Sequence, residues 1–428
     1  MSVPQLYDTV VVGGGIIGCF TAYFLSKAGQ RVLVCERDKI ANEQSGRAWG
    51  FIRQQGRHPA ELPLMREALD LWDEFNEEFG IGETDHVKAG VIVPAETTDD
   101  EKFLRRSLST AKSLSLPTEL ISPEELKHRV PEIAGNWRCA LQTSGDGHAD
   151  PCLSTHSVSR RSKALGVEFV EGRVVTGFVR SKGKVLGVQT DKGEICADNV
   201  VVAGGIGSRN VMKKLDFNAP IQIVRSSVVQ TTKAQPFTKI AMWCPTVSFR
   251  PARDGSFVIG NGFRGAGTDT DITLESFTNM RFFLRAFRRN YKHLKLTLSA
   301  DMFRSVADLL NGDKKFAALP EPRLNHRKVQ SNLLQFKKLF PHLQDVETWR
   351  SWAGRLDITP DLIPLIDRHQ NYANVFMAFG FSGHGFALGP SIGQQLSQWV
   401  CSGQPTLDLS KFKHTRFQDG DYQIVDAM

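Results

Sequence analysis

The chain has 428 residues, of which 41% are hydrophobic and 23% charged, as in a soluble globular protein of two or three domains. It contains no run of about 18 apolar residues, its first residues lack the pattern of a signal peptide, and its seven cysteines are scattered without a C-x-x-C pair. These features argue against a membrane-spanning protein, a disulfide framework and a metal site, predict a cytoplasmic location, and leave the net charge of +7 open to solubility or to an anionic ligand.

The first 36 residues predict a β-α-β unit. A strand over residues 7–12 ends in three glycines, a helix follows over residues 16–28, and a second strand over residues 31–35 stops at Glu36. This order is typical of a nucleotide-binding fold.

The glycines between this strand and helix form the motif Gly13-x-Gly15-x-x-Gly18. The first allows a tight turn, the second lets the backbone approach a pyrophosphate, and the third lets the helix pack close to the strand. The helix start at Ile16 and Ile17 directs its positive end toward that negative charge. The motif therefore predicts a dinucleotide site.

An acidic residue completes the unit. Glu36 lies about 20 residues after the glycines, where a carboxylate can bind ribose hydroxyls. Arg37 beside it could neutralise an adenosine phosphate or remain a solvated side chain. Because NAD, NADP and FAD all use this unit, the choice among them needs other segments.

The rest of the chain predicts mixed structure. A helix is expected near residues 61–80, another over 272–312, and a closing helix over Ser391 to Val400. A hairpin signal lies at Asp254-Gly255, and the residues from Pro405 onward resemble a poorly packed tail. Short strands separated by turns are expected at residues 167–170, 174–179, 185–189 and 200–203.

Two further glycine clusters lie far downstream of the first. One begins at Ala203 and Gly204, at the end of a strand that flavoproteins of this build place against the cofactor. The other spans residues 380–389 and opens the last helix, whose positive end could face the flavin N1–C2=O edge. Three separated segments converging on one ligand fit FAD better than a nicotinamide.

These stretches resemble the FAD-dependent D-amino-acid oxidase family, which includes glycine oxidase, sarcosine oxidase and D-amino-acid dehydrogenases. The matching stretches are Val10–Gly18, Ser45–Arg47, Val200–Ser208, Trp352–Asp361 and Phe379–Phe386. The resemblance implies an α/β fold, in which a Rossmann-like FAD-binding domain of the glutathione-reductase type carries an inserted α+β substrate domain built on an antiparallel sheet. The implied FAD-binding domain covers residues 1–60, 145–215 and 345–405, the substrate domain covers 61–144 and 216–344, and a C-terminal tail covers 406–428.

The resemblance also implies which residues contact FAD. The first glycine motif and Glu36 would bind the ADP half, and Val174 would contact the adenine side. The residues lining the pyrophosphate and flavin would be Ser45, Gly46 and Arg47. Those at the isoalloxazine ring would be Gly354, Gly383, His384, Gly385 and Phe386, with Ala387 directly after them.

The chain departs from the family pattern at three positions. Gly354 stands where sarcosine oxidases attach FAD to a cysteine, so non-covalent FAD is expected. Ala387 replaces a lysine used for substrate binding and oxygen activation, which predicts slow reaction with oxygen or another electron acceptor. Arg355 precedes Leu356 where glycine oxidases have an arginine before a proline, which leaves the substrate open.

Amine oxidation by flavin transfers a hydride from the α-carbon to flavin N5, and a substrate carboxylate is best anchored by an arginine. The candidates are Arg53, Arg250 and Arg355. We place Arg53 first, because it follows the flavin-lining loop and resembles the active-site stretch of sarcosine oxidases. For each arginine the alternative is a salt bridge or a phosphate contact.

Each of three other side chains has two alternative roles. His384 is either backbone-bonded scaffold or an acid–base group. Asp357 either bonds within its own loop or contacts the substrate amine, and Trp352 either walls the pocket or belongs to the ordinary core.

A basic stretch without acidic residues runs from Arg281 to Lys295 and has one apolar face. It predicts a surface helix or, alternatively, a docking face for an anionic membrane surface or an electron-accepting partner. Nothing supports nucleic-acid binding.

The sequence therefore predicts FAD-dependent oxidation of an amino acid or secondary amine to an imine, which hydrolyses to a keto acid or aldehyde. One alternative is an FAD-dependent 2-hydroxy-acid or glycerol-phosphate dehydrogenase. The other is the flavin subunit of a multi-subunit opine-type dehydrogenase. The expected location is the cytoplasm, or the inner face of the membrane.

Overall fold

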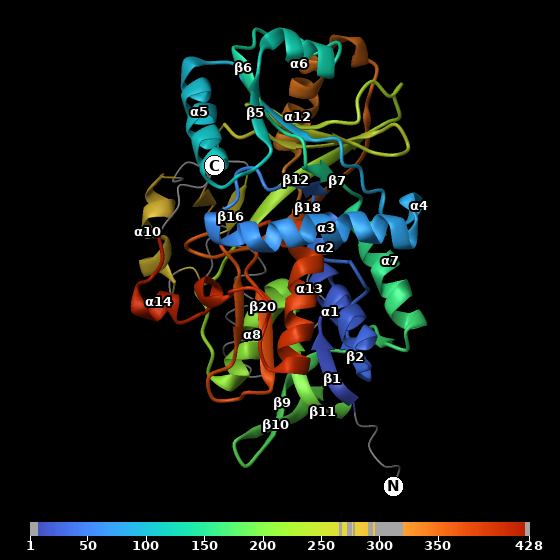
Figure 1. The fold of residues 1–428 in the computed structure, drawn as a ribbon, viewed down its shortest axis with the longest axis vertical. Helices are drawn as coiled ribbons and strands as arrows, with labels where there is room; N and C mark the ends of the chain where they lie inside the picture. Colours follow the sequence, from blue (N-terminus) through green and yellow to red (C-terminus); the bar gives the residue numbers. More distant parts are fainter. Residues whose placement is uncertain are drawn as a thin grey trace.

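The computed structural model describes residues 7–264, 268–271, 276, 279–289, 294–295 and 320–423. In this part of the chain two large sheets lie one above the other, with α3 (Leu62–Phe79) running across the level between them (Figure 1). No helix among these residues is long and apolar enough to cross a membrane.

The first sheet is mainly parallel and contains both ends of the predicted β-α-β unit. β1 (Tyr7–Val12) lies at its centre and pairs in parallel with β2 (Val32–Cys35) and β11 (Gly193–Val202). The valines of β1 are buried because both faces of the sheet are covered, which explains its continuous apolar run. The remaining strands are β8 (Glu168–Val170), β9 (Val175–Ser181), β10 (Lys184–Thr190), β19 (Leu365–Arg368) and β20 (Val375–Phe379).

Helices cover one face of this sheet. α1 (Ile16–Lys27) packs on α13 (Gly385–Ser402) and α7 (Pro151–Ala164), and the apolar face of α3 joins the same core. The predicted helix near residues 61–80 is thus confirmed, although it packs against the first sheet's helices rather than within the second sheet's core. The last helix begins at Gly385, six residues before the predicted start, because the glycine cluster forms its first turn.

The second sheet is mainly antiparallel and lies above the first in Figure 1, covered by α5 (Thr98–Ser113), α6 (Pro123–Arg129) and α12 (His326–Leu339). A core of apolar side chains fills the space between its strands and α12. Its strands are β4 (Val91–Ala95), β5 (Thr118–Ile121), β6 (Cys139–Thr143), β12 (Gln222–Thr231), β13 (Ala241–Trp243), β14 (Val247–Pro251), β15 (Phe257–Asn261), β16 (Asp269–Asp271), β17 (Leu294–Lys295) and β18 (Thr348–Ile358). The predicted fold class is confirmed.

β18 connects the two sheets. It pairs antiparallel with β12 along almost its whole length, and its end leads through Thr359 to β19 of the first sheet. Of the predicted helix over residues 272–312, Met280–Arg289 form α10, and most of the remainder lies outside the described residues. The prediction of one continuous helix is wrong at Leu294–Lys295, because these residues pair with β16 as the strand β17.

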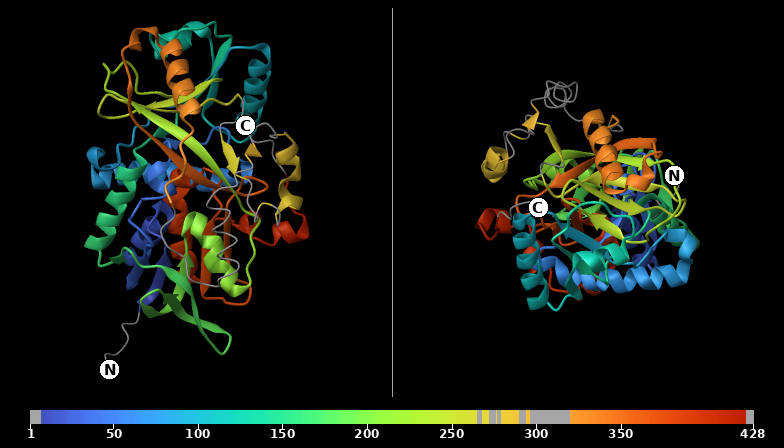
Figure 2. Two further views of the ribbon diagram at one scale, coloured as in Figure 1. Left: turned by 180° about the vertical axis from the view of Figure 1, so that it is seen from behind. Right: turned by 90° about the horizontal axis from the view of Figure 1, so that it is seen from above.

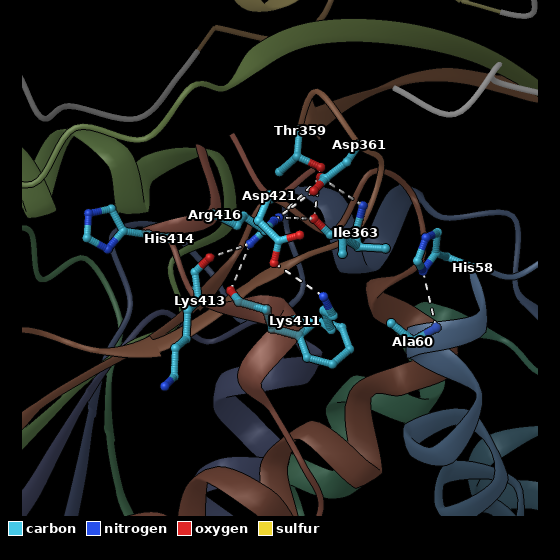
Figure 3. Close-up of polar contacts among 12 residues, drawn as sticks. His58, Ala60, Thr359, Asp361, Ile363, Lys411, Lys413, His414, Arg416 and Asp421 are labelled. Carbon is cyan, nitrogen blue, oxygen red and sulfur yellow. Dashed lines mark hydrogen bonds and ion pairs between the residues drawn. The ribbon is translucent and has the colours of Figure 1, made fainter. Parts of the chain in front are cut away.

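The C-terminal segment is firmly packed. The side chains of Leu409, Phe412 and Phe417 are buried, and the view from behind shows the helix at residues 416–419 against the body of the molecule (Figure 2). Arg416 Nε lies 2.7 Å from Asp361 Oδ2, and its Nη2 lies 3.2 Å from Oδ1, with both residues buried (Figure 3). The prediction of a poorly packed tail is therefore wrong for residues 405–423, because a buried ion pair and three aromatic or aliphatic side chains anchor it.

Candidate functional site

The first glycine motif has the geometry that its spacing predicts. Gly13 adopts a φ of +112°, and a Cβ there would lie 2.6 Å from the carbonyl oxygen of Ala203 and 2.7 Å from the Cα of Gly204. A Cβ at Gly18 would overlap the Gly13 carbonyl oxygen. The second glycine cluster and α1 therefore both approach this turn closely.

The first backbone N–H group of α1 donates a hydrogen bond to a side chain. Ser45 Oγ accepts a hydrogen bond of 2.9 Å from the backbone N–H of Ile16 and would lie 3.0 Å from a Cβ at Gly15. Ile17 and Gly46 are the neighbouring predicted contacts, and Gly46 fits tightly against the carbonyl of Ala41. Backbone donors, a helix N-terminus and a hydroxyl thus gather where a pyrophosphate would bind.

Glu36 lies at the edge of the same turn. Its Oε2 accepts a hydrogen bond of 2.7 Å from Gly14 N–H, its Oε1 accepts one of 2.8 Å from Asp38 N–H, and burial raises its pKa. The backbone N–H of Arg173 donates to the Glu36 carbonyl at 2.9 Å, so Val174 lies beside the end of β2. The buried Nε of Arg37 has no hydrogen-bond partner among the described residues.

We expect Glu36→Ala to weaken FAD binding by about 1.5–3 kcal/mol, because one charge-assisted hydrogen bond to ribose is lost. FAD titration followed by flavin fluorescence measures the dissociation constant, and circular dichroism checks the fold. Glu74→Ala, an exposed position on α3, is the control. An unchanged dissociation constant in Glu36→Ala would show that this carboxylate does not bind the ribose.

The first glycine cluster meets the second at Gly13, and two side chains join the second to the third. Gln44 Oε1 accepts a hydrogen bond of 3.0 Å from Ile206 N–H, and Gln44 Nε2 donates to Asp357 Oδ1 at 2.7 Å. Asp357 Oδ2 accepts one of 2.6 Å from Gly380 N–H at the start of the third cluster. The three segments therefore lie side by side, their convergence on one ligand stays a prediction, and Gln44 is a residue that sequence reasoning missed.

Asp357 is fully engaged by these contacts. Burial raises its pKa, and both carboxylate oxygens accept hydrogen bonds from protein donors. Its carbonyl also accepts from Ser382 N–H at 3.0 Å. This arrangement favours the loop-bonding interpretation over a contact with the substrate amine.

The third cluster turns sharply before α13. Gly383 has a φ of +88°, His384 follows it, and α13 begins at Gly385. The ring of Phe386 lies 5.2 Å from Trp72, whose Nε1 donates to the carbonyl of Ala387 at 2.9 Å. The Ala387 side chain is 1% exposed, within the apolar core.

Arg355 and its neighbours belong to a network of fixed contacts. Arg355 Nη1 lies 2.5 Å from Glu43 Oε1, and a Cβ at Gly354 would lie 3.2 Å from the Cβ of Arg47. Trp352 Nε1 donates to the Arg47 carbonyl at 3.0 Å. These contacts therefore favour a salt bridge, rather than a substrate anchor, as the role of Arg355.

Arg250 is also held by the protein. Its side chain is 2% exposed, its Nε donates to the Trp49 carbonyl at 2.6 Å, and its Nη2 lies 3.5 Å from Asp150 Oδ2. A salt bridge between segments is again the interpretation that these contacts favour.

Arg53 differs from both. Its guanidinium lies 4.4 Å above the ring of Trp243 on β13, and its Nη1 donates to the Gln55 carbonyl at 2.5 Å. Burial and the neighbouring Arg57 lower the pKa of Arg53 to about 9. Among the described residues, no carboxylate lies within ion-pair distance of it. Of the three predicted anchors, Arg53 is therefore the one whose charge is not paired with a carboxylate among the described residues.

A buried carboxylate shapes the turn that carries Arg53. Asp146 accepts hydrogen bonds from Gln54 N–H at 2.8 Å and Gln55 N–H at 3.3 Å, and burial raises its pKa to about 6. The same turn lies near His384, whose Nδ1 is 2.9 Å from Glu61 Oε1. Sequence reasoning missed Asp146, Glu61 and Trp243, because none belongs to a motif and each meets its partner far along the chain.

The residues present fit FAD. The glycine turn, the start of α1 and Glu36 suit an ADP half, and the loop before α13 suits the ring. Whether each predicted residue touches FAD stays a prediction.

Comparison with known proteins agrees with this arrangement. A model of the family "FAD dependent oxidoreductase" matches residues 8–399. Glycine oxidase of Pseudomonas putida is 24% identical over 95% of this chain and 97% of its own length. The 4-methylaminobutanoate oxidase (formaldehyde-forming) of Paenarthrobacter nicotinovorans is 24% identical over 97% of this chain, which spans 46% of that protein.

Solved structures show the same fold. The L-amino acid deaminase of Proteus myxofaciens, in complex with anthranilate, superposes with a TM-score of 0.88 at 25% identity, covering 97% of this chain and 95% of that one. L-proline dehydrogenase from P. horikoshii gives 0.79 at 23% identity, with 98% and 100% covered. The predictions of family, fold class, FAD and oxidoreductase class are confirmed: the chain belongs to the FAD dependent oxidoreductase family.

Proposed function

We propose that this protein oxidises an amino acid or a secondary amine bearing a carboxylate. The observation that carries the proposal is Arg53, a half-buried guanidinium stacked on Trp243 and without a carboxylate partner among the described residues, next to the loop that precedes α13. A guanidinium shielded in this way binds a carboxylate well, because less water competes for it than at an exposed site. Relatives named glycine oxidase and L-amino acid deaminase support this substrate class.

The reaction needs few protein groups. FAD, when bound, supplies the acceptor for a hydride from the substrate's α-carbon. Arg53 would hold the carboxylate and Trp243 would wall the pocket, so that the α-carbon is oriented for transfer. The imine product then hydrolyses to a keto acid or aldehyde. Non-covalent FAD stays part of the proposal, since Gly354 offers no thiol.

Anaerobic bleaching of the visible flavin band tests the proposal. We expect amino acids or N-alkyl amino acids to bleach the band and 2-hydroxy acids to leave it unchanged. Bleaching by hydroxy acids alone would establish the alternative dehydrogenase instead. Dye reduction by the protein purified alone distinguishes a free-standing enzyme from the flavin subunit of an opine-type complex.

We expect Arg53→Lys to lower kcat/KM by about 10- to 150-fold, mostly through KM, because a lysine cannot form the bidentate carboxylate contact, worth about 1.5–3 kcal/mol. Steady-state kinetics with the best substrate of the panel measures this change. Arg161→Lys is the matched control, since Arg161 on α7 also stacks on an aromatic ring, that of Phe79, and is exposed. Equal KM values in Arg53→Lys and wild type would remove Arg53 as the anchor.

We further propose an electron acceptor other than oxygen. Ala387 supplies no cation beside the flavin, whereas a unit charge about 4 Å away would contribute around 4 kcal/mol to a developing superoxide-like charge at an effective dielectric of about 20. We expect enzyme reduced by substrate without air to reoxidise faster with a quinone than in air-saturated buffer. Rapid stoichiometric peroxide formation would contradict this expectation.

The docking proposal concerns α10. Met280 and Leu284 are 36% and 41% exposed, and Arg281 stacks on Phe282, which contacts the C-terminal residues Phe417 and Tyr422. Exposed apolar groups beside arginines support a surface that meets an anionic membrane or an electron-accepting partner in the cytoplasm. Co-sedimentation with vesicles containing anionic lipid tests it, with neutral vesicles as the control. The part of the basic stretch at residues 290–293 lies outside the described residues.

A further inference from the structure

A carboxylate and an imidazole are paired at the start of α13. His384 Nδ1 lies 2.9 Å from Glu61 Oε1 and 3.2 Å from Glu61 Oε2. The two residues are 323 positions apart in the sequence, and Glu61, at the start of α3, has no exposed surface. A fully buried carboxylate that contacts an imidazole with both oxygens is a built arrangement rather than a surface encounter.

This contact fixes the protonation pattern of the imidazole. Burial opposes ionisation of Glu61, but His384 and Arg57 outweigh it and hold the pKa of Glu61 below its usual value. An ionised carboxylate only accepts, so Nδ1 of His384 carries the proton and Nε2 keeps its lone pair. No hydrogen bond from the described residues reaches Nε2, and the side chain is 20% exposed. The basic nitrogen is therefore accessible.

Burial and two neighbouring arginines keep this imidazole neutral before substrate binds. Burial, then Arg57, lower the pKa of His384, Glu61 raises it, and Arg53 lowers it further. A substrate carboxylate on Arg53 would cancel part of this repulsion. Binding would therefore increase the proton affinity of His384 at the moment when a base is needed.

An amino acid needs such a base. Near neutral pH its amine is an ammonium, and hydride leaves the α-carbon readily only when the nitrogen has a free electron pair. We propose that His384 is the base and Glu61 its positioning residue: an N–H bond of the substrate ammonium breaks, its electron pair stays on the substrate nitrogen, and the proton bonds to Nε2. The α-hydrogen would then leave with two electrons, for which bound FAD would supply the acceptor, while that nitrogen pair forms the C=N bond. This inference rests on the proposed function and adds a residue to it.

Glu61→Gln isolates the positioning role. A glutamine keeps the size of the side chain and can still accept the hydrogen bond from His58 N–H that Glu61 Oε2 accepts at 3.3 Å. Its amide would instead donate to Nδ1, so that Nε2 would carry the proton and lose its basicity. We expect the rate of flavin reduction, followed by anaerobic stopped flow at neutral pH, to fall by about 10²- to 10⁴-fold.

The pH profile separates this role from scaffolding. The deficit should shrink as the pH approaches the pKa of the substrate amine, because free amine then needs no base. His384→Gln should behave alike, which covers the case in which Glu61→Gln fails to fold. Glu67→Gln is the matched control, since Glu67 on α3 also binds α13, through Ser391 and Gln395, and should reduce at the wild-type rate.

Imidazole NMR of protein labelled with ¹⁵N-histidine gives a readout without turnover. We expect His384, assigned by its absence in His384→Gln, to be protonated at Nδ1 in the wild type and at Nε2 in Glu61→Gln. Protonation of the wild type at Nε2, or an equal deficit of Glu61→Gln at all pH values, would overturn the dyad while leaving the proposed function intact. If no amine reduces the wild-type flavin, the proposed function fails and the base assignment fails with it.

Discussion

Arg416→Met is expected to lower the free energy of unfolding by about 3–5 kcal/mol, because it leaves the carboxylate of Asp361 buried without its counter-charge. The exposures of Arg416 and Asp361 are 4% and 2%. Arg416 also donates to the carbonyl of Ile363 at 2.9 Å (Figure 3) and to that of Phe412 at 2.8 Å, so the loop at residues 361–363 and the C-terminal segment lose a common partner. Methionine keeps an unbranched apolar side chain, shorter than that of arginine, and removes these donors.

Chemical denaturation followed by circular dichroism measures the loss. Lys411→Met is the matched control, because Lys411 and Asp421 form an ion pair at 3.2 Å in the same segment but are 63% and 70% exposed. An exposed pair of this kind contributes at most about 1 kcal/mol. Adding Asp361→Asn to Arg416→Met should recover part of the stability. Equal losses in Arg416→Met and Lys411→Met would contradict the importance of the buried pair.

Gly18→Ala is expected to abolish FAD retention and to destabilise the fold by about 3 kcal/mol or more. A Cβ at this position would overlap the carbonyl oxygen of Gly13, and the side chain of Val11 lies 3.3 Å away. Because the obstacle is backbone, the methyl group can be accommodated only if α1 moves away from β1. That movement would separate the helix N-terminus from the turn at Gly13.

The FAD content of purified protein and its thermal denaturation midpoint measure this effect. Gly177→Ala on β9 is the control, since a Cβ there would meet its nearest atom, Gln189 Oε1, at an ordinary 3.6 Å. A Gly18→Ala protein with full FAD content would show that the close packing of α1 on β1 is not required for the cofactor.

The sequence correctly predicts those features of the fold that a local pattern of residues causes directly. The glycine spacing predicts the turn at Gly13 and the close packing at Gly18, and both are present. The convergence of three glycine clusters follows from their positions at strand ends. The packing of the C-terminal segment does not, because Arg416 resembles any surface arginine until Asp361, 55 residues away, is placed beside it.

The site shows the same division. The sequence alone does not distinguish the three candidate arginines, Arg53, Arg250 and Arg355. In the structure they differ in their partners, and those of Arg250 and Arg355 include carboxylates 100 and 312 residues away. Glu61 reads as the start of an amphipathic helix, and its contact with His384 depends on how α3 crosses α13. Local patterns therefore predicted the cofactor half of the site, whereas the substrate half depends on tertiary structure.

The strand order of the first sheet has a consequence for synthesis on the ribosome. β1 is made first, but its partner β11 ends at residue 202, and the helix that covers α1 ends at residue 402. The apolar faces of β1 and α1 therefore lack these partners until residues 202 and 402 have been made, and such long-range contacts form slowly. Nascent chains are therefore expected to expose these apolar faces until α13 emerges, and to retain FAD only after that point.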